Sequence, residues 1–326
     1  MELRIIGADQ VIELLPMQEC IDVVEHAMQR ASERDAIMPL RNAISLPQDG
    51  KFGWMPGYLG DPSVCGAKLV GVFERNFDLG MHSHNGVVVL FETEYGRPFA
   101  IVDAAEITAI RTAAASAMAT RLLSRPESTC LAILGYGAQA RQHLDAMLCV
   151  REFTQVRVWG RDPNKASDFC AEHANRCAIS IEAADSAHAA IDGADVICTV
   201  TGSPTPILRG EWIVPGQHIN AVGTSFPGIR ELDGPAVARS RLFVDLREGA
   251  LAQAGEFQMA RDEGLIDDNH ILGEIGEISL GRTEGRLTAD DVTLYKSLGL
   301  VVQDLAAAHY VYKKAVTRGV GVTSPF

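Results

Sequence analysis

Apolar positions near the start of the chain change from a helical to a strand-like spacing. Residues 17–33 have the period of an amphipathic helix, set by Ile21, Val24, Ala27 and Met28. Short apolar runs follow at 40–46, 52–58, 66–73, 87–91 and 99–102, and Gly, Pro, Asp and Asn residues separate them. We therefore expect a helix followed by a mostly antiparallel sheet.

A second pattern begins after this sheet. Asp103 and Glu106 have the spacing of a capping box and predict a helix that continues to about residue 123. From Thr129, short apolar runs alternate with connections longer than a hairpin, which is typical of a parallel, doubly wound sheet. The candidate strands are 130–135, 156–160, 178–181, 195–200, 218–223 and 241–246.

The end of the chain has the pattern of one long helix. Its expected start is the segment from Thr288 to Asp291, and the apolar positions that follow are Leu294, Leu298, Val301, Leu305 and Ala308. Because both terminal regions flank the α/β segment, we expect this helix to pack on the first domain.

Composition limits the class of protein. A chain of 326 residues is long enough for about two domains, and a net charge of −13 disfavours nucleic acid and anionic membranes as partners. No apolar run approaches the ~20 residues that cross a bilayer, and the first residues lack a signal-peptide pattern. The seven cysteines have no C-x-x-C spacing, which favours free thiols in a reducing compartment and predicts a cytoplasmic protein.

A strand, a Gly-rich turn and a helix start follow one another at the beginning of the α/β segment. Gly135, Gly137 and Ala140 occupy the G-x-G-x-x-A positions. Gly135 permits a tight turn, Gly137 permits the close approach of a pyrophosphate, and Ala140 permits close helix–strand contact. The first helical turn, with Ala138 and Gln139, presents backbone N–H groups to phosphates. This context predicts a dinucleotide site on a Rossmann-type doubly wound sheet, accompanied by a smaller α+β domain.

The end of the second strand bears on which dinucleotide binds. An acidic residue there would hold the ribose 2′-hydroxyl of NAD, but the chain has Gly160 and Arg161. A guanidinium can pair with a 2′-phosphate and stack on adenine. NADP is therefore favoured, with NAD as the alternative; under that alternative Arg161 is solvated and Asp162 caps the next helix.

The first domain contains cationic residues in unusual surroundings. Lys68 lies within an apolar run, and Arg111 lies among small apolar residues at a helix start. Burying such a cation is costly unless it meets an anion. Together with Arg41, these side chains predict a site for a carboxylate, for which arginine offers bidentate geometry. Solvated side chains or structural ion pairs are the alternative.

His82 and His84 lie on one face of an expected strand, a spacing that also occurs in metal sites. No third ligand is evident nearby, so we interpret them as a polar wall and predict no metal.

Taken together, these segments resemble the ornithine cyclodeaminase/μ-crystallin family along most of the chain. The resemblance rests on Arg41 and on segments that are quite specific to the family when they occur in this order: GAKLVGVF, HSHNGVVVLFE, ITAIRTAAASA, AILGYGAQARQH, INAVGTSFPGIRELD and TLYKSLGLVVQDLAAA.

The resemblance implies a homodimer whose substrate domains join through their sheets, with NAD(P) bound across a cleft. It implies that Arg41, Lys68 and Arg111 contact a substrate carboxylate beside Ser83, and that Thr112 touches the cofactor phosphates. Expected domains are 1–118 for substrate binding and dimerisation, completed by about 305–326, and 119–304 for NAD(P). Further expected cofactor contacts are Thr199, Val222 and Gly223.

One position departs from the cyclodeaminases. In their V-G-x-D-x-P-G segment an Asp acts as the acid/base group, whereas this chain has Ser225. A serine hydroxyl is no carboxylate base near pH 7, so deamination is disfavoured. Reducing an imine requires only that a proton reach nitrogen, from Lys68 or from water held by Ser225. We therefore expect NADPH-dependent reduction of a cyclic or α-imino acid, such as Δ1-pyrroline-2-carboxylate or Δ1-piperideine-2-carboxylate, to an L-amino acid.

Three other functions stay open at this point. They are ornithine cyclodeamination, an L-amino-acid dehydrogenase that releases a keto acid, and a non-catalytic ligand-binding role.

Overall fold

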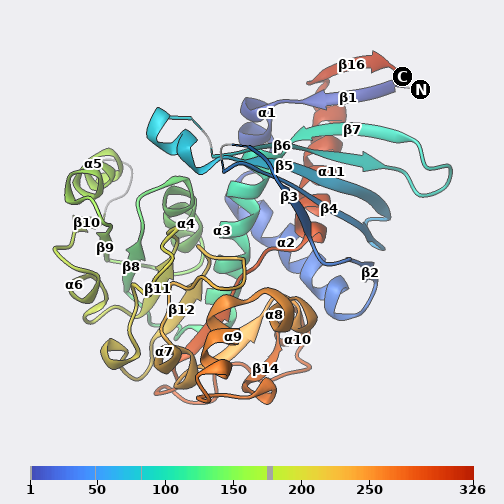
Figure 1. Ribbon diagram of the computed structural model, residues 1–326. Helices are drawn as coiled ribbons and strands as arrows, with labels where there is room; N and C mark the ends of the chain where they lie inside the picture. The colour runs from blue at the N-terminus through green and yellow to red at the C-terminus, as the bar shows by residue number, and fades with distance from the viewer. Residues whose placement is uncertain (1, 48, 82, 175–178) are drawn as a thin grey trace. The chain divides into compact units, whose positions relative to one another are not determined.

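The computed structural model of the chain describes residues 2–47, 49–81, 83–174 and 179–326 (Figure 1). Contacts divide the chain into two compact units. Unit 1 consists of Met1–Arg111 and Leu300–Phe326, and unit 2 of Thr112–Gly299. Each unit is built on its own sheet.

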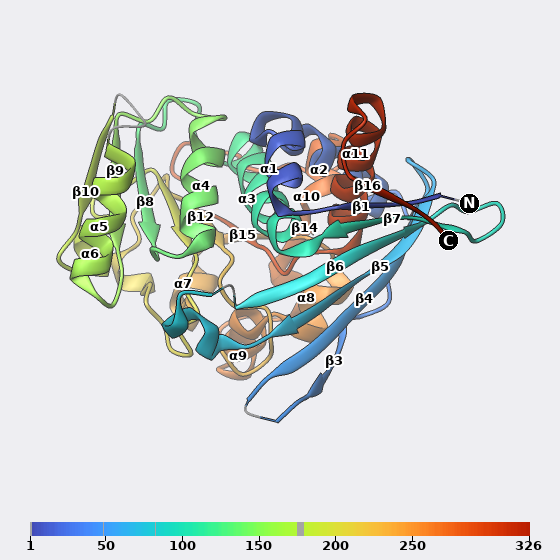
Figure 2. The same cartoon turned by 90° about the horizontal axis from the view of Figure 1, so that it is seen from above.

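The sheet of unit 1 has the order β16-β1-β7-β6-β5-β4-β2, with β3 paired to β4 (Figure 2). Its strands are β1 (Glu2–Ile6), β2 (Ala36–Ile37), β3 (Asn42–Ser45), β4 (Lys51–Leu59), β5 (Val64–Val72), β6 (His84–Phe91), β7 (Pro98–Asp103) and β16 (Val322–Pro325). Only the β1–β7 pair is parallel among the described pairings. The expected mostly antiparallel sheet is therefore confirmed.

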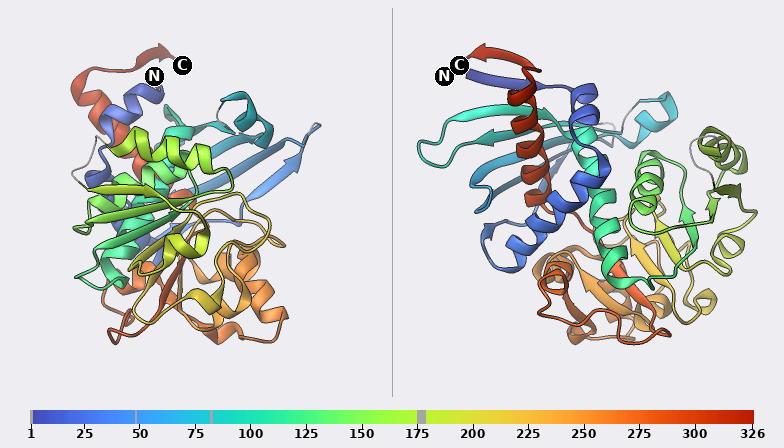
Figure 3. Two further views of the ribbon diagram at one scale, coloured as in Figure 1. Left: turned by 90° about the vertical axis from the view of Figure 1, so that its left-hand side faces the viewer. Right: turned by 180° about the vertical axis from the view of Figure 1, so that it is seen from behind.

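Helix α11 covers part of this sheet. The helices of unit 1 are α1 (Ala8–Leu14), α2 (Met17–Ser32), the 3-10 helix η1 (Glu74–Leu79) and α11 (Val301–Arg318). Helix α11 packs against α2, β4 and β5, and Figure 3 shows α11 in dark red beside α2 in blue. Gly66 in β5 makes the close contact possible, because a Cβ there would lie 2.1 Å from the carbonyl oxygen of Val89 and 3.0 Å from Leu305. The expected packing of the last helix on the first part of the chain is confirmed.

Helix α3 (Ala104–Leu123) runs through the boundary between the units. The Asp103 carboxylate accepts a hydrogen bond from the backbone N–H of Glu106 at 2.9 Å. This bond is the N-terminal cap expected from the two residues' spacing.

All pairings in the sheet of unit 2 are parallel, and its order is β10-β9-β8-β11-β12-β15-β13-β14. The strands are β8 (Cys130–Leu134), β9 (Gln155–Trp159), β10 (Ser180–Ala183), β11 (Val196–Thr199), β12 (His218–Ala221), β13 (Arg241–Val244), β14 (Ile271–Glu274) and β15 (Thr293–Lys296). Each of the six expected strands corresponds to a described strand, although Ala178 of the expected strand 178–181 lies outside the described residues, and β14 and β15 are additional.

Helices connect these strands. They are α4 (Ala138–Leu148), α5 (Pro163–Ala174), α6 (Ala187–Ile191), α7 (Gly234–Ala238), α8 (Arg247–Gln253), α9 (Gly255–Asp262) and α10 (Ile275–Ser279), with 3-10 helices η2 (Gly210–Trp212) and η3 (Asp268–His270). The connections through α4 and α5 run one way along the sheet, from β8 to β10, and the connection through α6 returns to β11; Figure 1 shows α5 and α6 on opposite sides of β9 and β10. The predicted doubly wound sheet is confirmed.

The prediction of a helix that starts at Thr288 is wrong for the first part of that segment. Residues 293–296 form strand β15 between β12 and β13, and the helix begins only at Val301. The Thr288 hydroxyl donates to Asp291 at 2.8 Å in a turn, not in a helix cap. A short apolar run fits a buried strand as well as a helix, and here the ladders on both sides select the strand.

Two general expectations also bear on the fold. Six of the seven cysteines are free, and Cys177 lies outside the described residues. Among the helices that the structure describes, none combines the length and apolar character needed to cross a membrane.

Candidate functional site

Lys68 and Arg111, two cations expected at the substrate site, meet in unit 1 on one carboxylate. Lys68 on β5 and Arg111 on α3 are each 4% exposed, and Asp304 on α11 is fully buried. The Lys68 Nζ lies 3.1 and 2.9 Å from the two Asp304 oxygens, and the Arg111 Nε donates to Asp304 Oδ1 at 2.9 Å. The sequence predicted the two cations but assigned no role to Asp304.

Neighbouring side chains fix the orientation of this cluster. The Arg111 Nη1 donates to Gln303 Oε1 at 2.7 Å, and the Gln303 amide donates to the sulfur of Met28 at 3.1 Å. Lys68 also donates to the hydroxyl of Thr108, one helical turn before Arg111, at 3.4 Å. The cluster therefore joins three segments that are far apart in the sequence.

Burial makes Lys68 an unusual lysine. Desolvation above all, together with the Arg111 and Arg41 charges, lowers its pKa to about 8, and Asp304 opposes this shift. A lysine with such a pKa exchanges its proton at near-neutral pH. It is thus suited to donate a proton to a bound substrate.

The other expected substrate residues lie less deeply. Arg41, which is half-buried between β2 and β3, is close enough for its charge to act on Lys68. The hydroxyl of Ser83 pairs with His84 Nδ1 at 3.0 Å, and no hydrogen bond in the described residues joins it to Lys68 or Arg111. His82 lies outside the described residues, which contain no group of His, Cys, Asp and Glu placed to hold a metal ion.

The Gly-rich turn of unit 2 has the shape that a pyrophosphate requires. Gly135 follows β8 with φ +135°, and a Cβ there would lie 2.9 Å from the carbonyl oxygen of Val200. Gly137 forms the N-cap of α4, and a Cβ added to it would meet no atom within 4 Å. No side chain caps this helix start and its first turn has no acid, which is the arrangement in which a helix start can bind an anion through the N–H groups around Ala138 and Gln139. The turn lies between β8 and β11, where the strand order reverses.

The end of β9 offers no carboxylate for a ribose. A Cβ on Gly160 would lie 2.2 Å from the ring of Tyr136, so a larger residue there would displace this ring. The side chain of Asp162 accepts a hydrogen bond from the N–H of Asn164 at 3.0 Å and caps α5. Arg161, which directly follows Gly160, is exposed.

A buried glutamate organises the segment after β12. Both carboxylate oxygens of Glu231, which is fully buried, accept hydrogen bonds. The donors are Thr199 Oγ1 at 2.8 Å, the N–H and hydroxyl of Thr201 at 2.6 and 2.7 Å, and the N–H of Gly223 at 2.8 Å. Burial raises the pKa of Glu231. Two expected cofactor residues, Thr199 and Gly223, are thus brought together, and Val222 donates its N–H to Thr199 at 3.0 Å.

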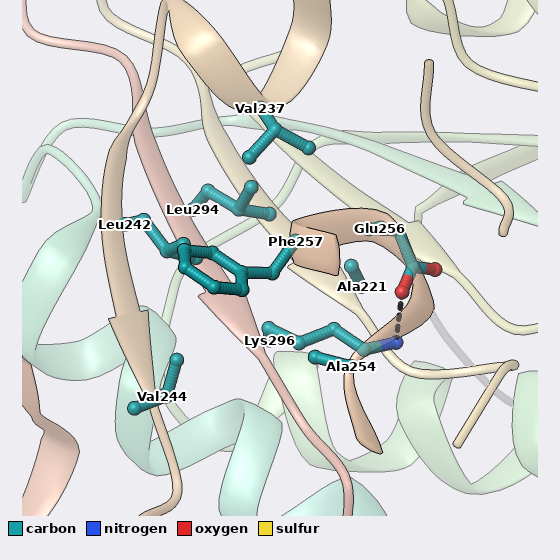
Figure 4. A pocket seen from close by; sticks show the side chains of 9 residues that line it. All are labelled: Ala221, Val237, Leu242, Val244, Ala254, Glu256, Phe257, Leu294 and Lys296. Carbon is teal, nitrogen blue, oxygen red and sulfur yellow. Dashed lines mark ion pairs between the residues drawn. The ribbon is translucent and has the colours of Figure 1, made fainter. Parts of the chain in front are cut away.

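An ion pair supports the same segment from below. Lys296 at the end of β15 lies 2.9 Å from Glu256, and Figure 4 shows the two side chains pointing toward each other beside Phe257. The Lys296 Nζ also donates to the carbonyl oxygen of Thr224 at 2.6 Å. Ser225, which is half-buried, directly follows this fixed residue. Lys296 and Glu231 lie in segments that carried the family resemblance, but a single sequence gave no signal for their roles.

The family model described as ornithine cyclodeaminase/mu-crystallin family matches residues 2–319. The chain belongs to this family. A Delta(1)-pyrroline-2-carboxylate reductase of Bacillus cereus (strain ZK / E33L) is 34% identical over 319 residues, which is 97% of this chain and 98% of the relative. The ketimine reductase mu-crystallin of Mus musculus is 38% identical over 277 residues, or 85% of this chain and 84% of the relative.

A solved structure of another family member has the same fold. The Thermococcus litoralis Delta(1)-pyrroline-2-carboxylate reductase, in complex with NADH and L-proline, matches with a TM-score of 0.95 at 34% identity. The match covers 98% of this chain and 99% of that chain. The predicted family and fold class are therefore confirmed.

Proposed function

We propose that this member of the ornithine cyclodeaminase/mu-crystallin family reduces the C=N bond of a cyclic or α-imino acid with NADPH and releases an L-amino acid. The observation that carries the proposal is the buried pair of Lys68 and Arg111, which combines an anion-binding charge with a proton available near neutral pH. The names of the relatives, Delta(1)-pyrroline-2-carboxylate reductase and ketimine reductase, support the same reaction class.

Each residue of the cluster has a role in this reaction. Arg111 and Arg41 hold the carboxylate of the imino acid, with Ser83 beside it, because guanidinium groups bind carboxylates through paired hydrogen bonds. A reduced nicotinamide, when bound, supplies the hydride that the imine carbon accepts. As the C=N π electrons move to nitrogen, Lys68 donates the proton that completes the amine, and it regains a proton from solvent. The overall change consumes one imine, one NADPH and one proton.

The turn and strand ends of unit 2 fit the cofactor. Gly135, Gly137 and Ala140 would hold the pyrophosphate against the start of α4, with Ala138 and Gln139 donating N–H groups. Thr112 on α3 would contact the phosphates, and the segment fixed by Glu231 would line the remainder of the site with Thr199, Val222 and Gly223. Exposed Arg161 beside Gly160 supports a preference for the 2′-phosphate of NADP over NAD.

Ser225 favours the reductase over a cyclodeaminase. Its hydroxyl supplies no carboxylate base near pH 7. The carboxylate of Glu256, which contacts the same segment, is already engaged. It pairs with Lys296 and lies within hydrogen-bonding distance of Thr224. In the reductase, the Ser225 hydroxyl would hold water near the reacting nitrogen.

The deciding experiment is a substrate screen that follows NADPH oxidation. The panel contains Δ1-pyrroline-2-carboxylate, Δ1-piperideine-2-carboxylate, and keto acids with ammonia or methylamine. We expect turnover of at least one cyclic imine and none of ornithine alone. Release of ammonia and proline from ornithine at a comparable rate would reject the reductase in favour of the cyclodeaminase, and turnover of keto acids with ammonia alone would indicate a dehydrogenase.

A homodimer is part of the proposal. Ile44 on β3 and Phe52 on β4, which are paired across the two strands, expose apolar surface at 52% and 37%. Exposed apolar patches of this kind are typical of protein interfaces. Light scattering should give about twice the 35.1 kDa chain mass, and a monomeric mass would reject the dimer.

A further inference from the structure

Asp304 is shared by the two cations of the candidate substrate site, although it lies 236 residues from Lys68 and 193 from Arg111. Its Oδ1 accepts from both Lys68 and Arg111, and its Oδ2 lies 2.9 Å from Lys68. The carboxylate itself is fully buried, so it neither reaches solvent nor presents a free surface to a substrate. Any effect of Asp304 on a bound substrate must therefore be transmitted by Lys68 and Arg111.

The charges in the cluster do not balance without a ligand. Lys68 and Arg111 contribute two positive charges, Asp304 one negative charge, and Arg41 adds a positive charge at the edge. Two buried cations this close would repel each other strongly without a shared anion. With Asp304 present, the cluster keeps a net positive charge that suits one carboxylate ligand.

Arg111 has a second partner, and Lys68 has no comparable one. The guanidinium of Arg111 also donates to Gln303 at 2.7 Å, whereas the further described contact of Lys68 is a long hydrogen bond to Thr108 at 3.4 Å. Loss of the Asp304 charge would therefore affect the protonation of Lys68 most, because arginine stays protonated in proteins.

We propose that Asp304 is a positioning residue that keeps Lys68 protonated and oriented for proton transfer while leaving the cluster able to bind an anionic substrate. This inference rests on the proposed function, since it assigns Lys68 the proton that reaches the substrate nitrogen. It goes beyond that function by placing the control of this proton on helix α11.

The surrounding charges determine the direction of the effect. Burial and the charges of Arg111 and Arg41 lower the pKa of Lys68 to about 8, and Asp304 opposes them. The thiol of Cys20 on α2 is close enough to be affected by the Arg111 charge, and burial raises its pKa so that it stays neutral. Removing the negative charge must therefore lower the pKa of Lys68 further.

The test is the pH dependence of kcat/KM for an imine in wild type and Asp304→Asn, which keeps the shape and removes the charge. We expect the basic limb to move down by about one pH unit or more. The ratio of wild type to variant would then be near one at pH 6 and about tenfold at pH 9. Asp304→Glu should return the limb toward its original position. Asp262→Asn, the same change at an exposed site on α9, should leave the profile unchanged.

A uniform loss of activity at all pH values, or an unmoved basic limb in an active Asp304→Asn variant, would overturn the proposal. If Asp304→Asn does not fold, the stability of the double variant Lys68→Met with Asp304→Asn is compared with that of Asp304→Asn alone. The double variant removes the lysine that the single variant leaves without its carboxylate. Recovery of the melting temperature supports the pairing, and no recovery rejects it. This arm needs no substrate, so it separates failure of the inference from failure of the proposed reaction.

Discussion

The backbone N–H of Gly223 donates to the Glu231 carboxylate at 2.8 Å, and the other donors to this carboxylate come from Thr199 and Thr201. One buried side chain thus ties together the ends of β11 and β12. Hydrogen bonds to a charged or buried acceptor contribute about 1.5–3 kcal/mol each when one partner is lost.

Glu231→Gln should therefore destabilise the protein and weaken cofactor binding. The amide would turn its NH2 group toward an N–H donor, which leaves at least one buried polar group unpaired. We expect a loss of about 2–4 kcal/mol in the free energy of unfolding, measured by urea denaturation, and a higher KM for NADPH. Glu211→Gln, on the exposed 3-10 helix η2, is the control; equal stability of the two variants would contradict the role of Glu231.

Lys68 predicts an alkaline limit to activity. Its pKa is about 8, and the protonated form is the one that donates, so kcat/KM should fall as pH rises through about 8. Lys68→Met should lower kcat/KM by about two orders of magnitude and remove this limb. Initial rates between pH 6 and 10 provide the check. A loss below tenfold would assign the proton to water held by Ser225.

Buried histidines predict a loss of stability in acid. His143 on α4 donates from Nδ1 to the carbonyl oxygen of Gln139 at 2.8 Å and pairs through Nε2 with Ser116 at 2.9 Å. Burial lowers its pKa to about 4, and that of His218 to about 3. The unfolded chain binds these protons near pH 6.5, so stability should decrease as pH falls from about 6.5 toward 4.

The expected size for His143 is about 3 kcal/mol across this range. His143→Gln should be less stable than wild type at pH 8 but should lose less stability between pH 7 and 5. His26→Gln, at an exposed histidine on α2, serves as the matched control. Denaturant titrations at each pH give the free energy of unfolding. If His143→Gln loses as much of this free energy between pH 7 and 5 as wild type does, the argument is wrong.

Substitutions at two nearby glycines, Gly135 and Gly137, should distinguish effects on stability from effects on cofactor binding. A methyl group on Gly137 meets no atom within 4 Å, so Gly137→Ala should keep its melting temperature while the methyl blocks the approach of a pyrophosphate. We expect at least a tenfold rise in the dissociation constant for NADPH, measured by fluorescence titration. Gly135→Ala, which combines φ +135° with a contact to Val200, should lose stability as well. Unimpaired NADPH binding by Gly137→Ala would place the cofactor elsewhere.

Arg161 predicts which nicotinamide cofactor is preferred. Arg161→Ala should raise the KM for NADPH about tenfold or more and leave the KM for NADH nearly unchanged, because only NADPH carries the 2′-phosphate. Arg97→Ala, at an exposed arginine that stacks on Tyr95, controls for the change in net charge. If both KM values stay at their wild-type level, Arg161 has no role in selecting the cofactor.

Local patterns predicted much of the fold. Residues 17–33, the runs that became β3 to β7, and the capping pair Asp103 and Glu106 all carry their signal within a few adjacent positions. Strand β15 escaped prediction because its apolar residues are equally compatible with a helix. Its conformation depends on the two strands that flank it, and residues of that kind are identified only by tertiary contacts.

The sequence by itself determined the Gly-rich turn from Gly135 to Ala140, because turn geometry and a free helix start are encoded in contiguous residues. It also indicated that Lys68 and Arg111 require an anion, since apolar surroundings penalise an unpaired charge. Only the tertiary structure decided which anion within the chain meets them. Asp304 reaches Lys68 because α11 packs on β5 over glycine, and no local pattern encodes a contact between residues so far apart in the chain.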